Sequence, residues 1–216
     1  MSNYQKNYWM RMSVYKIGLI FVFCVMMSII AGKAEAVAQE NQWLSIEHFY
    51  QAYKCKNPKE FAAIKKQATP RGAYLLARRF KPRPDWNEIK FLVKLHATFY
   101  KFFGNTFLQK ELLATGDRYI LKESTTEHVW GAGKDLSGKN YLGKIIMYVR
   151  DCLKENKKPH QFKTSAELHT LLDALYPYHQ KMDDIFFCHI HKPFYEFSNF
   201  YTLPDNGQLF IPPFEK

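Results

Sequence analysis

The run from Trp130 to Gly143 constrains the fold of this chain more than any other segment. It reads WGAGKDLSGKNYLG, with four glycines within thirteen residues, and it leads into a Met-Tyr-Val-Arg segment at 147–150. Glycine permits close backbone approach, and a loop that opens a helix can present free N–H groups to an anion such as a phosphate. The spacing matches neither the dinucleotide fingerprint nor the nucleotide-triphosphate loop, so the run alone predicts only a turn-rich segment before a helix.

Two further segments, taken together with this run, form a recognisable pattern. Residues 43–54 read WLSIEHFYQAYK, and residues 194–201 read FYEFSNFY. Together the three segments resemble the NADAR family, which includes the riboflavin-intermediate N-glycosidase. The family pattern runs from an aromatic-Ser-Asn-aromatic segment, through a Glu-His-aromatic-aromatic-Gln-Ala-x-Lys helix, to a Trp-Gly-x-Gly loop that ends in Asn-x-Leu-Gly and Met-x-Val-Arg. In this chain the first of these elements comes last.

The resemblance covers roughly residues 42–153 and 185–201. It implies an α+β fold that is mostly α-helical, with a small β element. At 216 residues the chain is long enough for one well-buried domain. Hydrophobic residues make up 47% of the chain and aromatic residues 17%, which indicates a packed core rather than disorder. We therefore expect a single NADAR-like domain over residues 39–216.

Residues 1–38 differ in composition from the rest. Lys6, Arg11 and Lys16 precede an uncharged run over 17–32, and small residues follow in an A-x-A pattern at 34–38. This pattern predicts a cleaved signal peptide; an uncleaved membrane segment and an upstream extension are the alternatives. A signal peptide would make the domain exported, that is, periplasmic or secreted. Otherwise the domain is membrane-anchored or cytoplasmic.

The remainder of the chain is basic. Residues 39–216 hold 27 basic and 19 acidic residues, a formal charge of +8. This excess favours a phosphorylated small molecule or a polyanion as the partner, and solubility alone is an adequate explanation too. Cys55, Cys152 and Cys188 show no metal-ligand spacing and no pairing pattern. We therefore expect neither a zinc site nor a disulfide framework.

Local signals predict a succession of helices. Ser45, Asn57-Pro58 and Thr69-Pro70 each begin a short helix, and a long helix begins near Asp85 and ends at Gly104. Further helices are expected at 107–114, 141–155 and 166–175, and strands at 118–122 and 185–189. The long helix is expected to bury one apolar stripe of Ile89, Leu92, Val93, His96, Phe99, Phe102 and Phe103.

A circular permutation explains the altered order of the motifs. Residues 156–182 would then be a connector between the two ancestral ends, and the new termini would open between residues 214 and 43. Such rearrangements are tolerated where chain ends lie close together at the surface. The permutation predicts that residues 210–214 lie beside residues 42–45.

Glu47, Gln51 and Lys54 are spaced i, i+4 and i+7, so they lie on one face of the helix that Ser45 begins. On spacing alone, a solvated helix face is the more common explanation. The resemblance favours a pocket instead. In the family this helix lines the binding pocket, and each of its motif positions is matched here.

Cleavage of an N-glycosidic bond requires a carboxylate beside C1 of the ribose, which stabilises the oxocarbenium-like transition state and deprotonates the attacking water. The resemblance implies that Glu47 is the principal catalytic carboxylate. Glu127 stands where the family usually has Asp, and we take it as the second. Its extra methylene moves the carboxylate, and a displacement of about 1 Å can cost on the order of a hundredfold in rate. No metal ion and no cofactor is expected.

The other candidate residues are expected to bind substrate. Trp130 stacks on the base or walls the pocket, whereas Trp86 is expected in the core. Asn140 anchors the loop or binds ribose hydroxyls, and Arg150 binds a phosphate or a structural carboxylate. The expected substrate-binding set is Gln51, Lys54, Trp130, Gly131, Asp135, Asn140, Arg150, Ser198 and Asn199.

The resemblance therefore implies an N-glycosidase that acts on a phosphoribosylated or ADP-ribosylated substrate. That substrate is either an early riboflavin intermediate or an ADP-ribosylated base in nucleic acid, and no obligate protein partner is inferred. Two alternatives remain open at this stage. One is a non-catalytic module that binds ADP-ribose or nucleotides, and the other is a secreted effector that uses the same glycosidase chemistry.

Overall fold

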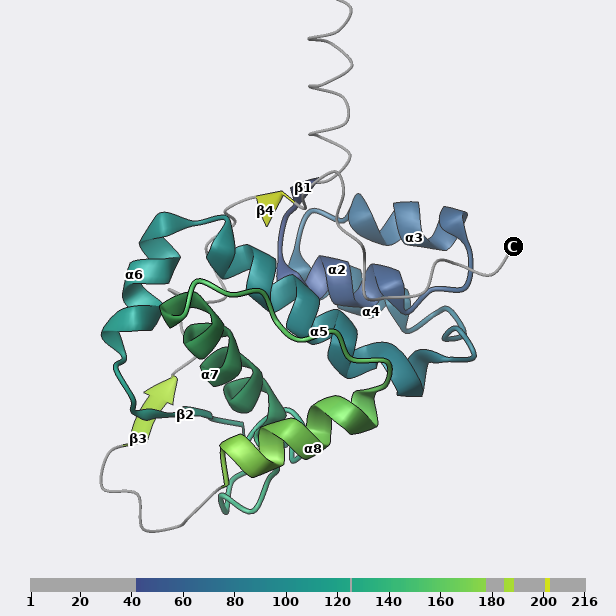
Figure 1. Ribbon diagram of the computed structural model, residues 1–216. Coiled ribbons are helices and arrows are strands. Elements are labelled where there is room, and N and C mark those ends of the chain that lie inside the picture. The colour runs from purple at the N-terminus through teal and green to yellow at the C-terminus, as the bar shows by residue number, and fades with distance from the viewer. Residues whose placement is uncertain (1–41, 125, 178–184, 189–200, 203–216) are drawn as a thin grey trace, which may run out of the picture. The chain divides into compact units, whose positions relative to one another are not determined.

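The structure is a computed structural model, and it describes residues 42–124, 126–177, 185–188 and 201–202 (Figure 1). These residues form seven helices and four short strands. The helices are α2 (Ile46–Tyr53), α3 (Pro58–Lys65), α4 (Pro70–Ala77), α5 (Trp86–Phe103), α6 (Thr106–Ala114), α7 (Tyr141–Lys154) and α8 (Ser165–Leu175). The strands are β1 (Gln42–Trp43), β2 (Tyr119–Lys122), β3 (Ile185–Cys188) and β4 (Tyr201–Thr202). The expected fold class, mostly helical with a small β element, is confirmed.

Helices α2, α3 and α4 begin where the sequence predicts. The side-chain oxygens of Ser45, Asn57 and Thr69 each accept a hydrogen bond from the backbone N–H three residues later. Pro58 and Pro70 occupy the first helical positions, where a missing N–H breaks no helical hydrogen bond. All of these signals are local, which is why the sequence alone locates the three helix starts.

Helix α5 is the centre of the fold, and α2, α6, α7 and α8 all pack against it (Figure 1). Six of the seven residues predicted to be buried on this helix are buried, but the prediction that they form a single stripe is wrong. Almost every side of α5 is buried, including Lys94, Thr98 and Lys101, whereas Phe103 is exposed. The reason is that helices on several sides cover α5, so burial no longer follows one apolar stripe.

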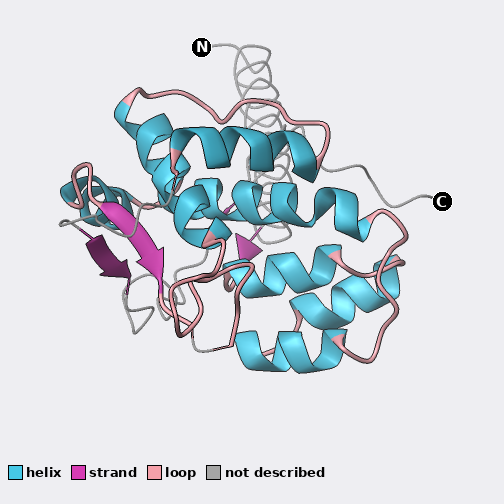
Figure 2. Ribbon diagram, turned by 90° about the horizontal axis from the view of Figure 1, so that it is seen from below, coloured by secondary structure: helices cyan, strands magenta, loops and turns pink. Residues whose placement is uncertain are grey.

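The strands form two pairs that join the end of the chain to earlier parts of it. β2 pairs in parallel with β3, with Tyr119 opposite Ile185. β1 pairs in antiparallel with β4, with Trp43 opposite Tyr201. Figure 2 shows β2 and β3 at one side of the helices. The strands predicted at 118–122 and 185–189 are confirmed to within one residue at each end.

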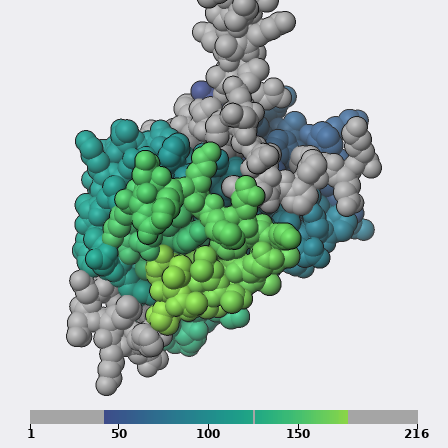
Figure 3. Space-filling view, viewed as in Figure 1, coloured from purple at the N-terminus to yellow at the C-terminus, as the bar shows by residue number. Residues whose placement is uncertain are grey.

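The segment predicted as a connector contributes to the core. Residues 155–164 pass over α5 to reach α8, and the green surface of α7, this segment and α8 covers the middle of the face seen in Figure 3. Leu168 and Leu172 of α8 are fully buried. Ser165 Oγ donates to the carbonyl oxygen of Glu88 at 2.7 Å, which ties the start of α8 to α5.

Three predictions fall on residues outside the described ranges. Residues 1–41 are not described, so the signal peptide and the start of the domain at residue 39 stay predictions. Residues 210–214 are not described either, so the circular permutation also stays a prediction. Among the residues that the structure describes, no helix combines the length and the apolar character needed to cross a bilayer.

Candidate active site

The first turn of α2 carries Glu47, whose side chain is 26% exposed. Gln51, one turn later, donates from Nε2 to Glu47 Oε1 at 2.7 Å. A carboxylate can only accept, so this bond fixes the orientation of the Gln51 amide. Gln51 Oε1 is then buried and accepts no hydrogen bond within the described part of the chain. Leaving such an acceptor unsatisfied costs about 1–3 kcal/mol, which a water molecule or a ligand hydroxyl would offset.

Lys94 of α5 supplies the cation that faces Glu47. Its Nζ lies 3.6 Å from Glu47 Oε2, and only 7% of the Lys94 side chain is exposed. The same ammonium lies 4.0 Å from the centroid of the Tyr50 ring and 5.5 Å from that of Trp130. Burial lowers the pKa of Lys94, and the negative charge of Glu47 opposes this shift. The structure therefore buries an ammonium between one carboxylate and two aromatic faces.

Aromatic rings border this pair of charges. The Trp130 ring lies 4.4 Å from that of Phe91 and meets Tyr50 edge-on at 5.8 Å. Trp86 packs edge-on against Tyr50 at 4.8 Å and is buried, as predicted. Burial, together with the charges of Glu47 and Glu127, raises the pKa of Tyr50, so its hydroxyl stays protonated at neutral pH. Trp130 is only partly buried, so part of its ring remains available for a ligand.

The second expected carboxylate lies in the same electrostatic neighbourhood. Glu127 pairs with Lys122, at the end of β2, and its side chain is 50% exposed. The charges of both residues act on the pKa of Lys94. Ser124 Oγ accepts from the backbone N–H of Glu127 at 2.9 Å and so holds the turn that carries it. Glu47 and Glu127 therefore approach Lys94 from different parts of the chain.

The glycines of the Gly-rich run let the chain pass close to itself. A Cβ on Gly138 would lie 2.3 Å from the carbonyl oxygen of Gly131, and a Cβ on Gly131 would lie 2.8 Å from the Cβ of Ser124. The N–H of Gly138 donates to Ala132 O at 2.7 Å, and that of Asn140 donates to Gly131 O at 3.2 Å. The expectation that the loop offers free N–H groups to an anion is wrong for these two residues, because the loop binds them itself.

Asn140 takes the first of its two expected roles. Its residue is buried, its φ is +51°, and its Nδ2 donates to Ile120 O at 2.9 Å. Its Oδ1 accepts from the backbone N–H of Lys122 at 2.9 Å. Both groups of the amide thus bind the backbone of β2, so Asn140 anchors the loop, and its expected contact with ribose hydroxyls is replaced by this role.

Arg150 also binds the protein itself. It is buried, and its Nη1 donates to Thr115 Oγ1 at 2.9 Å and to Arg118 O at 2.8 Å. It lies nine residues into α7, about 14 Å along the helix from the end that carries Asn140. Arg150 therefore ties α7 to the turn before β2, and its expected role as a phosphate ligand is not supported.

The remaining candidates fall into three groups. Asp135 is exposed and forms a local turn, in which its Oδ1 accepts a hydrogen bond from the hydroxyl of Ser137 at 2.8 Å. This hydrogen bond lowers the pKa of Asp135. Lys54 is the C-terminal cap residue of α2, and within the described residues Lys94 takes the place beside Glu47. Ser198 and Asn199 lie outside the described ranges, so their assignment to the site stays a prediction.

The histidine of the Glu-His motif is structural. His48 is fully buried; its Nδ1 lies 2.8 Å from Ser45 Oγ, and its Nε2 lies 2.9 Å from the carbonyl oxygen of Gln67. Burial lowers the pKa of His48, so the ring is neutral at pH 7. With Nε2 protonated, the ring links the start of α2 to the chain between α3 and α4. Glu47, the preceding residue, therefore lies on a different side of α2 from His48.

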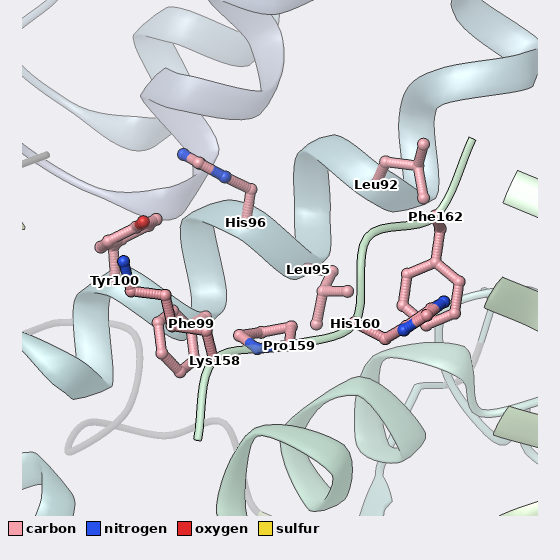
Figure 4. A pocket seen from close by; sticks show the side chains of 9 residues that line it. All are labelled: Leu92, Leu95, His96, Phe99, Tyr100, Lys158, Pro159, His160 and Phe162. Atoms are coloured by element: carbon pink, nitrogen blue, oxygen red, sulfur yellow. The ribbon is translucent and has the colours of Figure 1, made fainter. Parts of the chain in front are cut away.

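A small apolar pocket lies on another face of α5 (Figure 4). It lies between α5 and the segment after α7 and has a volume of only about 10 Å³, and Leu92, Leu95, Phe99, Pro159 and Phe162 are among the side chains that line it. On a helix of 3.6 residues per turn, Leu92 and Phe99 lie about 140–160° around the axis from Lys94. This pocket is therefore separate from the Glu47 cluster.

Two members of the cluster, Lys94 and Tyr50, were not among the residues predicted from the sequence. Lys94 had one available signal, since it interrupts the apolar run over residues 91–95, between Val93 and Leu95. That signal is not specific, because Lys101 is buried in the same helix one heptad later. Tyr50 lies on the predicted motif helix, but only the fold brings it against Trp130 and Lys94.

Known proteins resemble this chain over more than half of its length. The NADAR domain family matches residues 20–154. An N-glycosidase of Nostoc punctiforme is 36% identical over 118 residues, which cover 52% of this chain and 76% of that protein. N-glycosidase YbiA of Escherichia coli K12 is 33% identical over 113 residues, 51% of this chain and 71% of that protein. A riboflavin biosynthesis protein of Vibrio vulnificus is 36% identical over 132 residues, 59% of this chain but only 36% of that protein.

A solved structure is also similar. The NMR structure of the Escherichia coli protein YbiA has a TM-score of 0.49 and 30% identity to this chain, and the match covers 55% of this chain and 73% of that one. The family match begins at residue 20, inside the segment whose composition predicts a signal peptide, and ends with α7. Because the family matches more than half of the chain, and relatives above 30% identity are matched over more than two thirds of their length, this chain belongs to the NADAR domain family.

Proposed function

We propose that this protein is an N-glycosidase that hydrolyses the bond between a base and the ribose of a phosphoribosylated or ADP-ribosylated substrate. Relatives from Nostoc punctiforme and Shigella flexneri are named N-glycosidases, and the one from Vibrio vulnificus is named a riboflavin biosynthesis protein. One structural observation carries the proposal: the Glu47 carboxylate is held by Gln51 and Lys94, and Lys94 lies against the Trp130 ring.

In the proposed reaction Glu47 accepts a proton from a water molecule. The water oxygen then bonds to the anomeric carbon of the ribose as the carbon–nitrogen bond breaks. The electron pair of that bond leaves with the base, which takes up a proton. Positive charge develops on the sugar ring in the transition state, and the nearby carboxylate stabilises it. Water is the only co-reactant that this balance requires.

Gln51 and Lys94 position the carboxylate. Gln51 binds Oε1 and Lys94 faces Oε2, so the plane of the Glu47 carboxylate is fixed from two sides. Holding a reacting group in one geometry removes part of the entropic barrier to reaction. The free Gln51 Oε1 is a suitable acceptor for a ribose hydroxyl or for the attacking water.

The aromatic rings and Glu127 complete the proposed site. Trp130 and Tyr50 offer faces on which a departing base can stack. Glu127 is half exposed beside Lys122, so its carboxylate can add to the negative potential on the sugar or hold a water molecule. Glu47 is our choice for the proton acceptor, because Gln51 and Lys94 hold it, whereas Glu127 is half exposed and paired with Lys122.

Product analysis tests this proposal. The purified full chain is incubated with a pyrimidine ribosylamine phosphate and, separately, with an oligonucleotide that carries ADP-ribosylated guanine. Mass spectrometry then measures the released base and the released sugar phosphate or ADP-ribose. Release from one substrate class supports the proposal and identifies the class. Saturable binding of both with no release would show a binding module instead, and Glu111→Gln, an exposed change on α6, is the matched control for Glu47→Gln.

The compartment decides which substrates the enzyme meets. We propose export, on the basis of the signal-like residues 1–38. N-terminal sequencing of the mature protein tests this, because cleavage within residues 34–38 would place the domain outside the cytoplasm. An intact N-terminus on protein recovered from the cytoplasm would exclude the secreted effector.

A further inference from the structure

The positive charge of this chain is concentrated in one part of the domain. Residues 54–83 contain ten Lys and Arg residues and one acidic residue, Glu60, so their formal charge is +9. The whole chain of 216 residues carries +11. Charged residues that serve only solubility are normally spread over the surface, with both signs interspersed, and are not concentrated in one segment.

The fold brings the two helices that carry most of this charge together, and we call their exposed surface the α3–α4 face. Both helices pack against α2 and against each other, and Figure 1 shows them at the end of the domain away from α6 and β2. The face is defined by seven exposed cations on or beside these helices: Lys56, Lys59, Lys66, Arg71, Arg78, Arg79 and Lys81.

These cations have no acidic partners within the described part of the chain. None of the seven forms an ion pair there. Some cations on other surfaces do, as Lys154 does with Asp117 at 2.5 Å and Lys157 with Glu155 at 3.0 Å. Unpaired cations at this density produce a positive potential that attracts a polyanion.

The chemistry of the face fits nucleic acid. Three of its seven cations are arginines, whose guanidinium groups bind phosphates through paired hydrogen bonds and stack on bases. Tyr74 is 42% exposed, with the Arg78 guanidinium 5.8 Å from the ring centroid. An exposed aromatic ring among cations is typical of surfaces that bind single strands.

A membrane fits the face less well. An interfacial helix turns a continuous apolar face to the lipid. On α4, Ala73 and Ala77 point into the core, which leaves Tyr74 and Leu75 as the exposed apolar side chains of that helix. Seven cations also exceed what a single pyrophosphate needs, so the face suits a polymer better than a small ligand.

The face adjoins the Glu47 cluster. The backbone N–H of Arg83 donates to Lys54 O at 2.9 Å, and Trp86 meets Tyr50, so the chain leaving α4 lies along α2. Lys54 ends the helix face that starts at Glu47. A nucleic-acid strand bound on α3 and α4 would therefore meet α2 near Lys54. Lys54 lies about two helical turns from Glu47.

We propose that the α3–α4 face binds the phosphate backbone of single-stranded nucleic acid and delivers a base attached to that strand to the Glu47 cluster. The inference rests on the proposed glycosidase function for its second half, and it selects the nucleic-acid substrate over the free small molecule. An enzyme that acts on a base needs that base unpaired, which favours a single strand.

Fluorescence anisotropy of a labelled 20-nucleotide single strand tests the proposal, with the full chain carrying Glu47→Gln so that no turnover interferes. The face variant combines Lys59→Gln, Arg71→Gln, Arg78→Gln and Arg79→Gln. The control combines Lys110→Gln, Lys157→Gln, Lys158→Gln and Lys163→Gln, which removes the same charge from other surfaces. We expect the face variant to weaken binding at least tenfold at low salt and to reduce the salt slope by about 3, while the control changes affinity less than threefold.

The outcomes separate the two proposals. Strand binding that depends on the face, without base release by the unsubstituted chain, keeps the first half of this inference and rejects both the glycosidase and the delivery of a base to Glu47. Base release from a small ribosylamine phosphate without strand binding rejects this inference alone. Tighter binding to a duplex, equal losses in face and control variants, or binding only to phosphatidylserine vesicles would each overturn it.

Discussion

The cluster around Glu47 and the Gly-rich loop differ in how their polar groups are satisfied. Around Glu47 the fold buries an ammonium and leaves the Gln51 oxygen without a partner in the described structure. In the loop, the N–H groups of Gly138 and Asn140, and the Asn140 amide, bind other parts of the chain. A buried polar atom without a partner is destabilising, so the Gln51 oxygen beside the catalytic candidate Glu47 is a position where a ligand or water molecule would bind favourably.

The two regions therefore divide the work. In our proposal the loop positions Trp130 and fixes β2 against α7, and the face of α2 and α5 performs the chemistry. The following substitutions would break or sharpen this division.

Glu47→Gln has the largest expected effect. It keeps the shape of the side chain and removes the proton acceptor, so we expect kcat for base release to fall by about 10²–10⁴. The Kd for substrate should stay within about threefold, because most binding contacts remain. Rapid-quench kinetics and calorimetric titration measure the two quantities. Glu111→Gln should change neither, and equal losses in both variants would show that the effect is not specific to the site.

Lys94→Met should lower kcat by about a hundredfold, since the carboxylate loses the cation that holds Oε2. The matched control is Lys101→Met, which removes another buried lysine seven residues later on α5. If Lys94 acts through Glu47, kcat falls and KM changes little. A large increase in KM with constant kcat would instead make Lys94 a contact for bound substrate.

Gly138→Ala tests whether the loop is packed or open. The new methyl group would meet the backbone of Gly131 and Ala132, so we expect a loss of about 2–3 kcal/mol in the free energy of unfolding. Gly104→Ala is the control, because Gly104 has a φ of −82° and a Cβ there would have a single close neighbour, Tyr100 O at 3.1 Å. Chemical denaturation compares them. If Gly138→Ala leaves the stability unchanged and raises KM, the loop binds substrate directly, as the sequence first indicated.

Lys101 is buried but lies outside the proposed site, so its substitution should affect stability rather than catalysis. Burial lowers the pKa of Lys101 to about 8, so between pH 8 and 10.5 the unfolded chain binds a proton that the folded chain has lost. This lysine therefore makes stability rise with pH over that range. Lys101→Met should be more stable than the parent at pH 7, and that advantage should shrink by about 2 kcal/mol by pH 9.5. If the free energies of unfolding of the variant and the parent differ by the same amount at pH 7 and at pH 9.5, the lowered pKa of Lys101 is contradicted.

Asp135→Asn has the smallest expected effect. The amide can form the same turn with Ser137, and the carboxylate is exposed, so kcat/KM should change less than twofold. Initial rates at low substrate concentration measure it. A tenfold loss would show that the charge of Asp135 contacts substrate and that the loop takes part in binding.

Local signals and long-range contacts differ in what the sequence can predict. The helix starts at Ser45, Asn57 and Thr69 depend on residues within one turn, and all three were predicted. Glu47 and Gln51 share a helix face, so their contact also follows from spacing. Lys94 enters the cluster only because α5 crosses α2, and no periodicity reveals that crossing.

The Gly-rich loop shows the opposite difficulty. Glycines that bind a ligand and glycines that let two strands of a loop cross look identical in sequence. Only the contacts of Gly131 and Gly138 distinguish them. Asn140 was correctly expected as a possible anchor, but its left-handed backbone and its two bonds to β2 depend on a strand twenty residues earlier.

The central claim is that the reacting sugar lies against Glu47 rather than inside the Gly-rich loop. A crystal structure of the Glu47→Gln protein with uncleaved substrate tests it most directly. We predict an anomeric carbon within about 4 Å of the side chain at position 47, with the base against Trp130. A substrate whose anomeric carbon lies in the loop beside Asp135, out of reach of α2, would contradict the account.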